Sequence, residues 1–142
     1  MKKEPILTIA AIGFLTGCVL GMTGSFVPSD IARSILWAID SSGIILASAL
    51  LALYLSKKGQ DIAAAGFIIF AIAESIVFAS SSVDLNASLS AFAAGVFLWA
   101  LSIAVVSSQK VFPIFLRCTG IITALLFAIT AFQIFMGHPA TP

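Results

Sequence analysis

The sequence has few charged side chains for its length. Only 9% of its 142 residues are charged, whereas a soluble domain has about 25%. Hydrophobic residues make up 61% of the chain, and the mean hydropathy is +1.17. A soluble fold is therefore excluded, and the composition indicates a polytopic membrane protein. The net charge of +1 provides no basic stripe that could bind phosphates, so we expect no nucleic-acid partner.

Residues that commonly bind metals or act as nucleophiles are scarce. The single histidine, His138, lies near the C-terminus, which excludes a haem held by two histidines. A zinc site needs three or four close ligands, and the sequence offers no such cluster. Cys18 and Cys118 are expected at different depths in the membrane and form no C-x-x-C motif. We therefore predict no metal, no cofactor and no catalytic residue, and an enzyme is the least favoured class.

Long apolar runs fill most of the chain. A helix that crosses a bilayer needs about 20 apolar residues, and turn and capping residues separate five such runs. The predicted transmembrane helices cover residues 6–23, 31–56, 61–80, 88–107 and 113–136. All connections are short, so neighbouring helices should be antiparallel. The predicted fold is all-α: one domain, residues 1–142, that forms an antiparallel bundle of five transmembrane helices.

Basic residues indicate how this bundle is oriented. With a cytoplasmic N-terminus, every basic residue except Arg33 falls on the cytoplasmic side or at a helix start next to it. These residues are Lys2, Lys3, Lys57, Lys58, Lys110 and Arg117. Cytoplasmic loops are enriched in lysine and arginine. We therefore predict that the N-terminus is inside and the C-terminus outside, in the cytoplasmic (inner) membrane of a bacterium.

Glycines follow a regular spacing in the first apolar run. Gly13, Gly17 and Gly21 recur every four residues, and small residues at this spacing let two helix backbones approach closely in lipid. We interpret them as a packing seam, either within the bundle or between two copies of the chain. The plain alternative is that glycine is common in membrane helices. A seam between molecules would make the first helix the contact for a homo-oligomer or another membrane protein.

The same run also resembles the signal peptide and lipobox of bacterial lipoproteins. Two lysines are followed by apolar residues and then by the sequence LTGC at 15–18. A cleaved signal is usually followed by polar chain, whereas Val19 and Leu20 continue the apolar run. We therefore expect this segment to remain as the first span. If it were removed, four membrane helices would be left.

Strongly polar side chains gather in the outer half of the predicted bundle. At about 1.5 Å per residue, Asp40 would lie about 15 Å deep and Glu74 about 9 Å deep. A charge at such a depth is costly and normally faces protein or water. Arg33 should reach one of these carboxylates along its apolar stem. The candidate pocket or ion-pair residues are Arg33, Trp37, Asp40, Ser41, Glu74, Trp99, Thr130 and Gln133.

Two interpretations of this polar set stay open. An Arg33–carboxylate pair could lock two helices together, or the polar stripes could converge on an outward-facing pocket. Buried threonines often bond to a carbonyl of their own helix, which favours packing over ligand binding for Thr130. Core filling is the plain interpretation of Trp37 and Trp99.

Three functions of different classes fit these observations. The favoured one is a non-catalytic multi-pass protein that self-associates or serves as an accessory subunit of a membrane complex. The first alternative is a proton-linked transporter or small-ligand-binding protein that uses Arg33, Asp40 and Glu74 in an outward-facing pocket. The second alternative is a membrane enzyme that acts on a lipid or a quinone. The lipid bilayer is the one partner that composition requires.

Overall fold

The computed structural model describes residues 4–83 and 85–138, which form five long helices. These are α1 (Pro5–Phe26), α2 (Asp30–Lys57), α3 (Asp61–Ser81), α4 (Leu85–Ser108) and α5 (Ile114–Phe135). All five are long and apolar enough to cross a membrane. The prediction of an all-helical chain with five helices long and apolar enough to span a membrane is confirmed.

Helix ends differ from the predicted ones by a few residues. The chain was expected to turn from Gly24, but α1 continues to Phe26. Gly24 is buried against the Trp37 ring, which an added Cβ would approach to 2.7 Å, so helix packing holds this glycine in the helix. Ser29 caps α2, and its Oγ accepts a hydrogen bond from the Ala32 N–H over 3.4 Å.

The start of α4 also differs from its expected position. The helix begins at Leu85, three residues before the predicted first residue. Ser88, the first residue of the predicted span, therefore lies inside the helix. Its hydroxyl donates to the Ser80 carbonyl over 2.7 Å and joins α4 to the end of α3.

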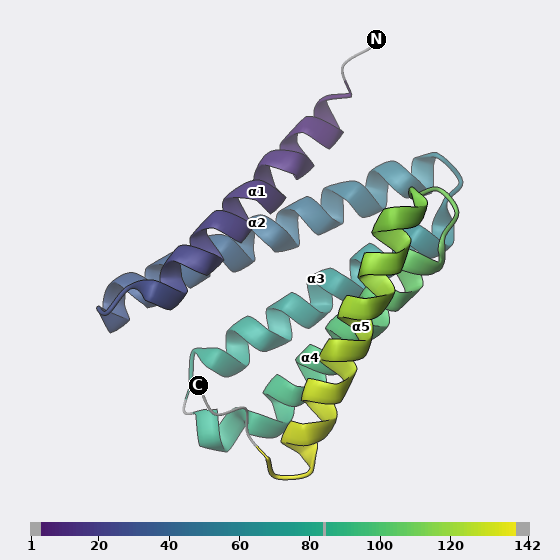
Figure 1. Ribbon diagram of the computed structural model, residues 1–142. Coiled ribbons are helices and arrows are strands. Elements are labelled where there is room, and N and C mark those ends of the chain that lie inside the picture. The colour runs from purple at the N-terminus through teal and green to yellow at the C-terminus, as the bar shows by residue number, and fades with distance from the viewer. Residues whose placement is uncertain (1–3, 84, 139–142) are drawn as a thin grey trace.

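Neighbouring helices run antiparallel, so the turns alternate between two ends of the molecule. Figure 1 shows the α2–α3 and α4–α5 turns at one end, and the α1–α2 and α3–α4 turns at the other. Among residues 4–83 and 85–138, close backbone approaches join each helix only to its neighbours in the sequence. The bundle is therefore open, because α1 and α5 do not close it.

Small residues and hydroxyl groups hold the helices together. Most of the buried apolar residues are alanines, whereas many large aliphatic and aromatic side chains point outward, as expected for a surface covered by lipid. Ser102 is almost fully buried, and its hydroxyl donates to the Gly66 carbonyl of α3 over 2.8 Å. Rings of non-adjacent helices also meet: the centroids of Phe14 in α1 and Phe67 in α3 are 6.3 Å apart.

Candidate functional site

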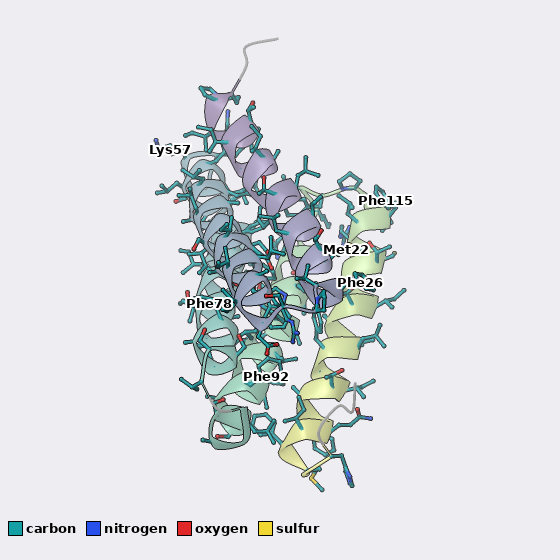
Figure 2. The ribbon with its side chains drawn as sticks, turned by 90° about the vertical axis from the view of Figure 1, so that its left-hand side faces the viewer. Met22, Phe26, Lys57, Phe78, Phe92 and Phe115 are labelled. Atoms are coloured by element: carbon teal, nitrogen blue, oxygen red, sulfur yellow. The ribbon has the colours of Figure 1, made fainter. Side chains whose placement is uncertain are left out.

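A cavity of about 360 Å³ lies among α1, α2, α3 and α4. It occupies the half of the molecule nearer the α1–α2 and α3–α4 turns. Its polar lining comes from three helices and consists of Ser25, Asp40, Ser41, Glu74 and Ser81. Figure 2 shows Phe78 and Phe92, which also line it, in the half of the molecule away from Lys57 and Phe115.

Glu74 is the most deeply buried acid of this site. Its residue is only 5% exposed, and its Oε1 accepts a hydrogen bond of 2.7 Å from the hydroxyl of Ser41. Ser41 is itself buried on α2, so this bond connects α2 to α3 inside the bundle. Glu74 forms no ion pair within the described part of the chain. A hydrogen bond from a hydroxyl orients the carboxylate but does not neutralise it.

Asp40 faces α1, where glycines leave room for it. A Cβ added at Gly21 would lie 2.5 Å from Asp40 Oδ2, and one added at Gly17 would lie 3.0 Å from Oδ1. The Oδ1 atom is buried and has no hydrogen-bond partner. Asp40 is also close enough to Glu74 for the two carboxyl groups to interact electrostatically. Two acids from adjacent helices therefore share one cavity, and each lacks a cationic partner in the described chain.

Four aromatic side chains complete the wall of the cavity. They come from three helices and are Trp37, Phe78, Phe92 and Trp99. Trp99 is held by ring contacts on both sides, with centroid distances of 6.4 Å to Phe70 and 5.5 Å to Phe127. Its indole N–H lies near the Glu74 carboxyl group but is buried and makes no hydrogen bond. The wall is thus largely aromatic, with one donor and one acceptor unused.

Arg33 does not reach either carboxylate, which corrects the expected pairing. Its Nη2 lies 2.9 Å from Oδ1 of Asp30, one turn away on α2, and its Nε donates to the Val27 carbonyl. The side chain of Asp30 is 92% exposed. This local pair leaves Asp30 in contact with water, whereas a pair with Glu74 would bury the arginine charge.

A second hollow of about 280 Å³, lined by Arg33 near the helix ends, adjoins the main cavity. The two hollows share Trp37, Phe78 and Ser81. Arg33 therefore lies beside the site rather than inside it, with its guanidinium carbon 6.0 Å from the Trp37 ring centroid.

Thr130 and Gln133 lie on α5, away from the main cavity. The Thr130 hydroxyl donates to the Leu126 carbonyl of its own helix over 3.0 Å, and Gln133 is exposed. The expected convergence fails for these two residues because, in the described part of the chain, the backbone of α5 closely approaches that of α4 only. Of the sequence candidates, the structure brings together Trp37, Asp40, Ser41, Glu74 and Trp99.

The candidate residues chosen from the sequence did not include several residues that line the main cavity. Phe78 and Ser81 follow Glu74 by one and two helical turns, so helical spacing from the acid would have found them. Phe92 likewise precedes Trp99 by two turns. Ser25 carried no such signal, because it was assigned to a turn and not to α1.

All three glycines of the proposed seam face α2 of the same chain. A Cβ added at Gly13 would lie 2.9 Å from both the Ala47 Cβ and the Gly43 carbonyl oxygen. Gly17 and Gly21 meet Ile44 and Asp40 in the same way. This face of α1 is therefore covered within one molecule.

The arrangement suits binding better than covalent chemistry. Within residues 4–83 and 85–138, no three His, Cys, Asp or Glu residues are grouped so that they could hold a metal ion. The cavity offers two carboxyl groups, three hydroxyls and four aromatic side chains, a combination of polar and apolar groups that is typical of small-ligand pockets. The family models, the curated proteins and the solved structures contain no match to this chain.

Proposed function

We propose that this chain is a small-ligand-binding protein of the bacterial cytoplasmic membrane, and that its ligand enters the α1–α4 cavity from the outer side. One observation carries the proposal: Asp40 and Glu74 share a cavity of about 360 Å³ without a cationic partner among the described residues. An unpaired buried polar group costs about 1–3 kcal/mol. A bound ligand that pairs with these groups would recover that cost.

The proposed orientation places this cavity on the extracytoplasmic side. Lys57, Lys58 and Lys110 all lie at the end that holds the α2–α3 and α4–α5 turns, opposite the cavity. The positive-inside rule assigns that end to the cytoplasm. The N-terminus is then inside, and a ligand reaches the site without crossing the membrane.

Self-association or an accessory role is the second candidate, and it loses its main sequence support. The glycine face, which could have packed either within the bundle or against a partner, is occupied by α2 of the same chain. What still favours this candidate is the open bundle, in which the described backbone of α1 closely approaches that of α2 only. Proton-linked transport extends the first proposal and requires binding to the same cavity first.

The test uses the full chain in lipid nanodiscs and its own fluorescence. The chain has two tryptophans, and both line the cavity, so tryptophan emission reports on this site and, through Trp37, on the adjoining hollow. Three classes of small solute are titrated: organic cations, organic anions and neutral alcohols. The proposal expects a saturable change for at least one class, and this change should be lost in Glu74→Gln. The matched control is Asp61→Asn, an exposed acid at the opposite end. No saturable change with any class would overturn the proposal.

A further inference from the structure

We propose that the ligand of the α1–α4 cavity is a small organic ammonium cation. This inference rests on the proposed binding function and names the chemical class of the ligand. Its three arguments are the charge of the wall, the aromatic faces and the size of the cavity.

The charge of the wall selects a cation. Asp40 and Glu74 line the cavity, and no lysine, arginine or histidine is among its lining residues. The nearest basic side chain, Arg33, is engaged by Asp30 at 2.9 Å. A buried carboxylate is stabilised by a paired opposite charge, and none of the residues that line this cavity supplies one.

The aromatic faces select an organic cation over a metal ion. Trp37, Phe78, Phe92 and Trp99 surround the same space as the two acids. Cations with attached methyl groups bind the faces of such rings, and quaternary ammonium groups are recognised by aromatic cages in this way. Calcium requires six to eight oxygen ligands. In this wall the oxygen-bearing side chains share the space with four aromatic side chains, so it is not the all-oxygen shell that such an ion requires.

The volume of the cavity and the indole N–H of Trp99 narrow the choice of ligand further. A volume of about 360 Å³ lies at the lower end of ligand pockets, which span about 300–1,000 Å³, so the cation is small. The Trp99 indole N–H is buried near the Glu74 carboxyl group and makes no hydrogen bond of standard geometry. A hydroxyl oxygen on the ligand would accept from it, while Asp40 Oδ1 would face the ammonium group. An ammonium ion that also carries a hydroxyl therefore fits the site best.

The experiment compares two ligands that differ only in charge. Choline and its uncharged isostere, in which carbon replaces the nitrogen, are titrated into the full chain in nanodiscs while tryptophan emission is recorded. We expect choline to bind at least about tenfold more tightly than the isostere, a difference of about 1.4 kcal/mol. Sodium and calcium chloride, each alone, should give no saturable change.

Three variants assign the effect to the cavity. Glu74→Gln and Asp40→Asn should each weaken choline binding at least about tenfold, and Phe78→Leu should weaken it about threefold to tenfold. Phe115→Leu, an exposed ring at the other end of the molecule, is the control. The comparison of choline with the isostere uses only the unmodified chain, so it stands even if a variant fails to fold.

The outcomes separate this inference from the proposed function. Equal binding of choline and the isostere, or saturable binding of an anion or of calcium alone, would overturn the ammonium assignment and leave a ligand-binding cavity. Absence of binding by every probe would overturn both proposals.

Discussion

The carboxylate of Asp40 occupies the space that a side chain at Gly21 would fill, because a Cβ there would lie 2.5 Å from Oδ2. The same glycine face brings α1 close to α2 and makes room for an acid in the cavity wall. Helix packing and the candidate site therefore depend on the same residues. Substitutions along α1 should separate the two effects, because the contacts of each glycine differ.

Gly13→Ala should destabilise the protein. The new Cβ would lie 2.9 Å from a backbone carbonyl oxygen, that of Gly43, which cannot rotate away. We expect a loss of about 1–3 kcal/mol in the free energy of unfolding, typical of overpacking. Gly43→Ala is the matched control, since its Cβ would lie 3.4 Å from the Gly13 oxygen, an ordinary contact. Unfolding in mixed micelles, followed by circular dichroism, measures both. Equal stability of the two variants would contradict the packing described for α1.

Gly21→Ala should impair binding more than stability. Its Cβ meets the end of the Asp40 side chain and no backbone atom, so the carboxylate shifts and the helices need not separate. We expect choline affinity to fall about threefold or more, at a cost of roughly 0.7 kcal/mol. The loss of unfolding free energy should be smaller than in Gly13→Ala. Nanodisc titration and micelle unfolding provide the two readouts, and unchanged choline affinity would speak against Asp40 in the site.

Arg33→Gln should leave choline affinity within about twofold of the unmodified chain. Arg33 pairs with Asp30, and its ion pair is solvent-exposed, so its loss should change stability by about 0.2–1 kcal/mol. A large gain in affinity would mean that Arg33 competes for Asp40 or Glu74 in the membrane. Titration of both proteins with choline in the same nanodiscs distinguishes these results.

Ser102→Ala tests a hydrogen bond that joins two helices. Ser102 is 1% exposed and donates to the Gly66 carbonyl of α3. Such bonds contribute about 0.6–1.7 kcal/mol in membrane proteins, and the variant should lose that amount in unfolding free energy. Ser75→Ala removes the same atom from an exposed serine that bonds within α3. Ser102→Ala should therefore lower the free energy of unfolding more than Ser75→Ala does. An equal loss in the two variants would count against the hydrogen bond between α3 and α4.

Thiol labelling tests the orientation. In a background of Cys18→Ala and Cys118→Ala, Ser82→Cys and Gly59→Cys place single thiols in the α3–α4 and α2–α3 turns. A membrane-impermeant maleimide should label position 82 in intact cells and position 59 only after permeabilisation. The reverse pattern would place the cavity on the cytoplasmic side and overturn the proposed route of ligand entry.

The five helices were predictable because hydropathy dominates membrane folding. Every backbone group in lipid must bond within its own helix, so long apolar runs leave little choice of structure. The helix ends were less predictable. Gly24 has the local signature of a turn, yet its contact with Trp37 keeps it helical. That contact involves a residue of the next helix, which local sequence patterns do not reveal.

Part of the site was predictable because the helices could be located from hydropathy. Depth in the membrane follows from residue number, so Asp40 and Glu74 could be placed at similar levels. Which helices adjoin was not readable from the pattern of polar stripes, and Thr130 and Gln133 were included although α5 does not reach the cavity. The sequence placed both the buried acids and Asp30 near Arg33. In the structure Arg33 pairs with Asp30, the exposed acid on its own helix.

Each helix closely approaches only the helices that precede and follow it in the described sequence, and this arrangement affects how the protein assembles during synthesis. A chain emerges from the ribosome N-terminal end first, and each new span here finds its contact surface on the span just inserted. Few distant segments must meet, which is the arrangement that favours rapid folding. Assembly can therefore proceed hairpin by hairpin as translation continues, and α4 is the last helix to contribute residues to the wall of the cavity.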